Sequence, residues 1–139
     1  MDQNELVLIS GKQGSGKSTL AKGITESPLM TELFPNIHRV KFADFIYEQH
    51  DSIANNLRFC GIDSVPDKDG ELLQILGAHF RKKYGADFFV NIVKNKIKAT
   101  IDTHCGGNLF VIDDCRFPNE FNAFPFAFSV RLIAPEDDR

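Results

Sequence analysis

The sequence of 139 residues contains no tryptophan, only two methionines, and no apolar stretch near the ~20 residues that a membrane-spanning helix needs. Its start, MDQNE, is polar and acidic and lacks the apolar segment of a secretory signal peptide. We therefore expect no membrane partner and a cytoplasmic location.

Cysteine is also scarce. Cys60, Cys105 and Cys115 are odd in number and have no C-x-x-C spacing, which excludes the disulfide framework of a small secreted domain. The pattern fits reduced thiols in the cytosol. Because free cysteines behave mostly as small apolar residues, we expect them to be buried and unreactive.

Positive charge is not in excess. Sixteen lysines and arginines against nineteen acidic residues give a net charge of -3 and a pI of about 5.8. Nucleic acid is therefore not an expected partner, and any phosphate recognition must come from a local arrangement. With 42% hydrophobic residues, the chain is long enough to form one compact domain over residues 1–139 with its own core.

Short apolar runs alternate with longer helical patterns along the chain. The expected strands are residues 6–10, 38–43, 109–112 and 126–134, and the expected helices are residues 16–26, 44–59, 72–80 and 88–101. Strands that alternate with helices favour an α/β fold with a mainly parallel sheet and helices on both faces.

A phosphate-binding motif follows the first expected strand. Gly11–Ser18, GKQGSGKS, matches G-x-x-x-x-G-K-[ST] and lies between an expected strand and an expected helix, as the P-loop mechanism requires. Glycine-rich backbone lets N–H groups surround a phosphate, and the helix N-terminus adds positive potential. The residues expected to bind ATP are Gly11, Gly14, Ser15, Gly16, Lys17, Ser18 and Thr19.

Carboxylates end another expected strand. Residues 109–112 are apolar and lead into Asp113 and Asp114, at a place where a P-loop enzyme holds Mg²⁺. Strand alternation sends the two side chains to opposite faces, so we expect only one to enter the site, and we favour Asp113 together with the Ser18 hydroxyl. The plainer alternative is an acid that merely ends a strand.

Three further blocks carry a specific resemblance. Residues 71–77 (ELLQILG), 87–90 (DFFV) and 111–120 (VIDDCRFPNE) resemble, in order and spacing, the deoxynucleoside monophosphate kinases of tailed bacteriophages. With the P-loop, the resemblance spans about residues 6–134. It implies a three-layer, adenylate-kinase-like P-loop NTPase fold, a host cytoplasm as location, and transfer of the ATP γ-phosphate to a deoxynucleoside monophosphate (dNMP).

The resemblance also implies roles for single residues. Residues 44–105 would form a helical insertion that binds the acceptor, and Lys17, Asp113 and Arg116 would carry catalysis. The residues implied to bind the acceptor are Asp44, Gln74, Arg81 and Arg116. Each has a plainer alternative: the N-cap of the next helix for Asp44, a surface amide for Gln74, a solvated helix end for Arg81, and an ion pair with Glu120 for Arg116.

The sequence departs from the family pattern in two regions. Asp69-Gly70 stands where relatives carry arginine before the Leu-Leu-Gln block, with only Lys68 nearby, and Ala78 replaces a frequent hydroxyl. Relatives continue beyond the position of Arg139 into a lid, a last strand and a helix, so we expect a fold without the lid and last strand.

Two other functions remain open from the sequence. Another small-molecule P-loop kinase would share residues 9–19 without needing the Arg116 block, and a non-catalytic nucleotide-binding remnant would bind ATP without transferring phosphate. The acceptor base and the oligomeric state, a homodimer among the options, are left open.

Overall fold

The computed structural model describes residues 3–12 and 14–133. Within them it contains four strands, all parallel, and six helices, which confirms the predicted α/β class and parallel sheet. The strands are β1 (Asn4–Gly11), β2 (Asn36–Arg39), β3 (Asn108–Cys115) and β4 (Phe128–Leu132). The helices are α1 (Lys17–Glu26), α2 (Pro28–Leu33), α3 (Asp44–Phe59), α4 (Gly70–Tyr84), α5 (Phe88–Thr103) and α6 (Pro118–Asn122).

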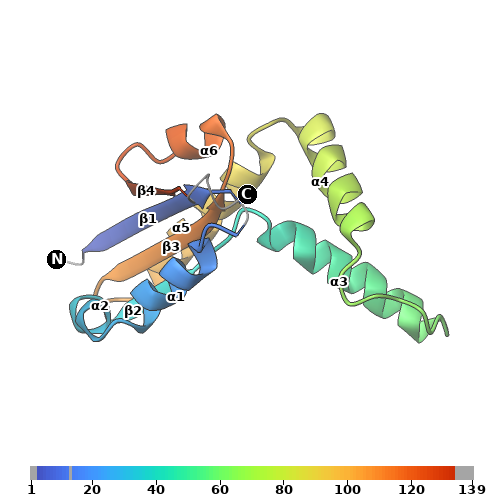
Figure 1. The fold of residues 1–139 in the computed structure, drawn as a ribbon, viewed down its shortest axis with the longest axis horizontal. Coiled ribbons are helices and arrows are strands. Elements are labelled where there is room, and N and C mark those ends of the chain that lie inside the picture. The colour runs from blue at the N-terminus through green and yellow to red at the C-terminus, as the bar shows by residue number, and fades with distance from the viewer. Residues whose placement is uncertain (1–2, 13, 134–139) are drawn as a thin grey trace.

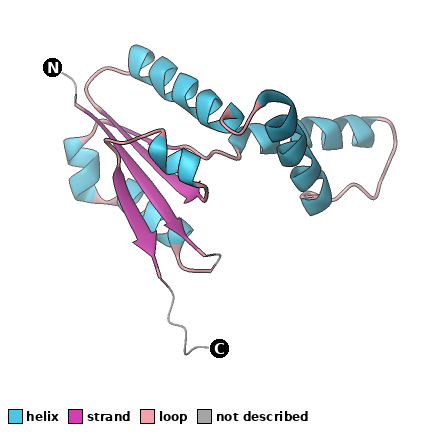
Figure 2. Ribbon diagram, turned by 90° about the horizontal axis from the view of Figure 1, so that it is seen from above, coloured by secondary structure: helices cyan, strands magenta, loops and turns pink. Residues whose placement is uncertain are grey.

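Helices cover both faces of the sheet, whose strand order is β2-β3-β1-β4 (Figures 1 and 2). Alternation along β1 sends Ile9 toward α1, whose Ala21 is fully buried, and sends Leu8 toward α5 and its Val93. Two apolar cores result, one on each face. The domain is therefore built in three layers, helix on sheet on helix.

Helices α3 and α4 extend away from the sheet (Figure 1) and contact each other. An aromatic cluster joins them to α5, with the Phe80 ring 5.3 Å from Phe88 and 5.5 Å from Phe45. The buried His50 of α3 accepts a hydrogen bond from the backbone N–H of Asp69, which caps α4. We call α3 and α4 the helical arm. Helix α5, the last helix of the predicted 44–105 insertion, packs on the sheet instead.

Two short helices were not expected from the sequence. Helix α2 begins with Pro28 after Ser27, whose hydroxyl accepts from the backbone N–H of Met30, and α6 begins with Pro118. Proline at the first helical position starts a helix as readily as it ends one. Strand β2 ends at Arg39, earlier than predicted, and Ala134 of the last expected strand lies outside the described residues.

The topology places the C-terminal ends of all four strands at one edge of the sheet. The chain leaves β1 on the α1 face and leaves β3 on the opposite face, so a crevice opens between the ends of these adjacent strands. Over the described ranges, no helix combines the length and apolar character required to cross a lipid bilayer.

Candidate functional site

The glycine loop between β1 and α1, here called the cradle, contains two glycines in left-handed conformations. Gly14 and Gly16 adopt φ values of 83° and 95°, and an added Cβ would meet nothing within 4 Å at either one, so backbone conformation rather than space requires glycine there. Among the described residues, no side chain caps α1, as is also the case for α3 and α5, whereas Ser27 caps α2 and Asp69 caps α4. The first N–H groups of α1 are therefore open to a ligand.

Gly11 is required for a different reason. A Cβ there would lie 2.7 Å from the carbonyl oxygen of Leu132 in β4 and 2.7 Å from the Ser15 hydroxyl oxygen. That hydroxyl is buried and has no hydrogen-bond partner among the described residues. The Lys17 ammonium donates to the Gly11 carbonyl at 2.8 Å. The loop thus folds tightly on itself and holds its lysine at the mouth of the cradle.

A cleft of about 860 Å³, here called the loop cleft, opens beside the cradle. It is lined by Gly11, Lys12, Gly14, Gly16, Lys17, Ser18, Thr19, Lys41, Lys68, Asp113, Asp114 and Arg116. Five of these side chains are cationic and two are acidic, in a chain with a net charge of -3. The cleft therefore concentrates positive charge at the predicted phosphate-binding loop.

Asp113 is held by two cations. Its Oδ2 lies 2.8 Å from Arg39 and its Oδ1 lies 3.0 Å from the Lys41 ammonium, while its own side chain is only 3% exposed. Burial raises the pKa of Asp113, but the hydrogen bonds and charges of Lys41 and Arg39 together bring it below its usual value. The carboxylate is ionised and already compensated, so direct coordination of a metal ion would require it to give up a partner.

Asp114 accepts hydrogen bonds from the backbone N–H groups of Phe42 and Ala43, both at 3.0 Å. Burial is the main influence on this carboxyl and raises its pKa, against the lowering effect of the two N–H groups. The side chain ties the end of β3 to the segment that follows β2.

The expectation that only one of the two carboxylates would enter the site is wrong, since both line the loop cleft. The β1–β3 ladder shifts register, with Leu8 opposite Ile112 but Ser10 opposite Cys115. An advance of three residues on β3 is thus matched by two residues on β1. At this end of β3, successive side chains therefore no longer alternate strictly between the two faces of the sheet.

A second cleft of about 300 Å³, the arm cleft, adjoins the first and shares Asp114 and Arg116 with it. The arm cleft is lined by Phe42, Ala43, Ile46, Tyr47, Leu73, Gln74, Gly77, Ala78, Arg81, Asp114, Arg116, Phe117 and Glu120. Helices α3 and α4 and the segment after β3 form its walls. The structure therefore brings Gln74, Arg81 and Arg116 together in one cleft.

The two arginines of the arm cleft have guanidinium groups without an ion pair among the described residues. Arg81 lies between aromatic rings, 5.0 Å from the Phe89 centroid and 5.1 Å from that of Phe117. Gly77 makes room for it, since a Cβ there would lie 3.2 Å from Arg81 Nη1. The alternative ion pair between Arg116 and Glu120 is absent, because Glu120 accepts instead from the backbone N–H groups of Arg116 and Phe117.

Asp44 lies apart from these residues. Its Oδ2 accepts from the backbone N–H of Lys41 at 2.9 Å and lies 3.6 Å from the Lys96 ammonium, and it lines neither the loop cleft nor the arm cleft. The alternative in which Asp44 is the N-cap of α3 is wrong, because Ala43 holds that position and Asp44 is the first helical residue.

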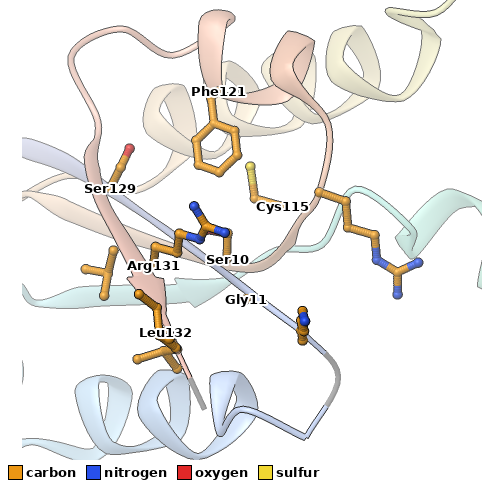
Figure 3. Close-up of a pocket in the computed structure, with 11 residues that line it drawn as sticks. Ser10, Gly11, Cys115, Phe121, Ser129, Arg131 and Leu132 are labelled. Atoms are coloured by element: carbon orange, nitrogen blue, oxygen red, sulfur yellow. The ribbon is translucent and has the colours of Figure 1, made fainter. Parts of the chain in front are cut away.

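A third cleft of about 810 Å³, the β4 cleft, lies on the other side of the glycine loop (Figure 3). Phe121 of α6, Cys115 of β3 and Arg131 of β4 point into it. Burial, followed by the nearby Glu120 and Asp114, raises the pKa of the Cys115 thiol to about 12. Cys115 is thus buried as expected, but the expectation of burial is wrong for Cys60 and Cys105, which are exposed.

Several lining residues were missed by sequence reasoning. Lys41 lines the loop cleft, and Arg39 does not line it but pairs with Asp113. The two stand two apart in HRVKF, a spacing that gives one face in an extended segment, and this was the available signal. Tyr47 directly follows the apolar Phe45 and Ile46, and no sequence signal singled it out for the arm cleft.

Comparison of the sequence with protein-family models and with curated proteins finds no match. Within the described ranges, no group of three or more histidine, cysteine, aspartate or glutamate residues is arranged to hold a metal ion.

Proposed function

We propose that this chain is an ATP-dependent kinase that transfers the γ-phosphate of ATP to a dNMP, built on a P-loop NTPase fold. One observation carries the proposal: the loop cleft beside the glycine cradle and the arm cleft share Asp114 and Arg116. Two nucleotides with their phosphates at that shared wall would face each other directly. The strand order β2-β3-β1-β4 and the uncapped α1 support the same assignment.

In the loop cleft, the N–H groups of the cradle and of the first turn of α1 would surround the ATP phosphates. Lys17 would exchange the Gly11 carbonyl for the β- and γ-phosphate oxygens, and Thr19 would hydrogen-bond the α-phosphate. In the arm cleft, Arg81 would bind the acceptor phosphate, with its donors unpaired and its plane held by two rings. Gln74 would present its amide to the base.

Mg²⁺ fits this site through few protein ligands. The Ser18 hydroxyl lines the cleft, and Mg²⁺ in phosphate-transfer enzymes takes its remaining ligands from phosphates and water. Asp113 is better placed to contact those waters than the ion itself, because its two oxygens already form ion pairs with Arg39 and Lys41. When bound, the ion would neutralise phosphate charge.

The acceptor of such a reaction is a phosphate oxyanion at neutral pH, so no strong general base is required. Positioning and charge neutralisation then account for catalysis, with direct in-line transfer and no covalent intermediate on the protein. Arg116 stands at the shared wall and would stabilise the charge on the transferring group.

The test is ADP formation measured with ATP and each of dAMP, dGMP, dCMP and dTMP, beside a panel of nucleosides and coenzyme precursors. We expect dNMP-dependent ADP formation that falls about 100-fold or more in Lys17→Ala. Lys22→Ala, which removes an exposed lysine from the same helix, is the matched control and should retain the wild-type rate.

The other outcomes separate the remaining functions. Activity only with a nucleoside or a coenzyme precursor would identify a different small-molecule kinase. Saturable ATP binding without turnover on any acceptor would identify a non-catalytic nucleotide-binding protein.

A further inference from the structure

Lys41 brings a cation to the loop cleft from outside the phosphate-binding motif. It lines the same cleft as Lys17 and Ser18, but it follows the end of β2, two strands away from β1 in the sheet. Lys41 lies at a position where strand β2 has already ended, so its role is not to extend the sheet.

The backbone around Lys41 is held firmly. Its N–H donates to Asp44 at 2.9 Å, and the N–H groups of Phe42 and Ala43 both donate to Asp114. The Lys41 ammonium has three donors, and the ion pair with Asp113 at 3.0 Å uses one of them. With 39% of its side chain exposed, Lys41 can donate to a ligand in the cleft without leaving its place.

The negative charge of Asp113 is already balanced without Lys41. Arg39 already lies 2.8 Å from the other carboxylate oxygen, so two cations meet the Asp113 carboxylate. Asp114 also lies near Lys41, but the loop cleft is lined by five cationic and two acidic side chains, which leaves positive charge in surplus there. That surplus lies in a cleft lined by the glycine loop. An anionic ligand at the loop is the partner that would balance it.

We propose that Lys41 is a further phosphate-binding residue for the nucleoside triphosphate, positioned by Asp113 and Arg39. The inference rests on the proposed binding of ATP in the loop cleft. Asp113 then acts as the tether that keeps the Lys41 ammonium at the cleft, and Arg39 keeps the carboxylate compensated when Lys41 donates to phosphate.

The test is calorimetric titration with ATP, with and without Mg²⁺, of the wild type, Lys41→Met, Lys41→Arg and the double variant Lys41→Met/Asp113→Asn. We expect Lys41→Met and the double variant to bind ATP about tenfold more weakly or worse, as loss of a charge-assisted hydrogen bond predicts. Lys41→Arg, which keeps the charge, should stay within about threefold of the wild type. Lys98→Met, an exposed lysine on α5, is the matched control and should bind normally.

In the double variant, Asp113 no longer carries a charge that Lys41 could neutralise, so any loss of ATP affinity reports on a contact between Lys41 and phosphate. The double variant also provides the measurement if Lys41→Met alone fails to fold. Wild-type affinity in the double variant would overturn the proposal, because Lys41 would then only neutralise the carboxylate. Wild-type affinity in Lys41→Met would overturn it as well. If the wild type itself binds no ATP, the proposed function fails, which is a different result from normal ATP binding that does not depend on Lys41.

Discussion

Glycines serve this chain in distinct ways at neighbouring positions. Gly11 has no room for a side chain, because a Cβ would lie 2.7 Å from a backbone oxygen of β4, whereas Gly16 has room but a left-handed φ of 95°. Gly23 has neither constraint, since it is exposed in the interior of α1 with nothing within 4 Å of an added Cβ. Substitution by alanine separates these cases.

Gly23→Ala should raise the free energy of unfolding by about 0.5–1 kcal/mol, because alanine loses less conformational entropy in a helix. Gly11→Ala should lower it by about 1–3 kcal/mol, because Leu132 of β4 must move. Urea denaturation measures both. A Gly11→Ala protein as stable as the wild type would show that β4 does not approach the loop as closely as described.

Asp113 gives a prediction about pH. Its pKa is lower in the folded chain than in the unfolded one, so its contribution to stability is present above the unfolded pKa and is lost as the pH falls through the folded pKa. Asp113→Asn should therefore lower the free energy of unfolding by about 1–2 kcal/mol at pH 7, because Arg39 and Lys41 lose their partner while remaining partly exposed.

The difference between Asp113→Asn and the wild type should shrink below about pH 4. Urea denaturation at pH 7, 5 and 3 checks this, with the exposed Asp102→Asn as control. A difference that does not change with pH would mean that the ion pairs with Arg39 and Lys41 contribute nothing to stability.

Among the elements, those with strong periodicity were predictable. Helix α3 was predicted over residues 44–59, as found, and β1 and β3 were recognised from their apolar runs. Helix α4 is longer than predicted because Asp69 caps it and Gly85 ends it, with a φ of 106°. Helix α2 was missed because Ser27-Pro28 was interpreted as a stop, although its serine caps the helix that starts there.

The candidate site was predictable where it depends on local pattern. The glycine loop lies between β1 and α1, as its motif predicted, and Gly14 and Gly16 adopt positive φ values. The convergence of Arg39 and Lys41 on Asp113 was not predictable, because it joins positions 74 and 72 residues apart and depends on strand order. The register shift that brings both carboxylates to the loop cleft has no local sequence signal.

Helix α4 links stability to the arm cleft, since it carries Gln74 and Arg81 and is capped by Asp69. Asp69→Ala should lower the free energy of unfolding by about 1 kcal/mol. It should also raise KM for the dNMP several-fold and change KM for ATP less, because residues of α4 line the arm cleft, whereas Lys68, beside the cap, is the nearby residue that lines the loop cleft. Steady-state kinetics with each substrate varied provide the measurement.

Ser27→Ala is the matched control for the cap of α4. It removes the cap of α2, a helix that lines neither the loop cleft nor the arm cleft, so it should reduce stability without altering either KM. Equal KM changes in Asp69→Ala and Ser27→Ala would contradict a specific link between α4 and acceptor binding.

The molecule as a whole is acidic, yet five of its sixteen lysines and arginines line one cleft, most of them near the edge where the strands end. Lys12, Lys17, Lys41, Lys68 and Arg116 line one cleft in a chain with a net charge of -3. The parallel sheet makes this possible, because parallel strands direct all their C-terminal ends to the same edge. Composition alone could not show this concentration of charge.

The most direct test of the account is calorimetric titration of the whole chain with Mg·ATP, for the wild type and Lys17→Ala. We predict saturable binding of one ATP per chain, weakened about tenfold or more by Lys17→Ala, because the ammonium loses its charge-assisted hydrogen bonds to phosphate. Absence of binding to the folded wild type, or equal affinity of the two proteins, would contradict the claim that the glycine loop is a nucleotide-binding site.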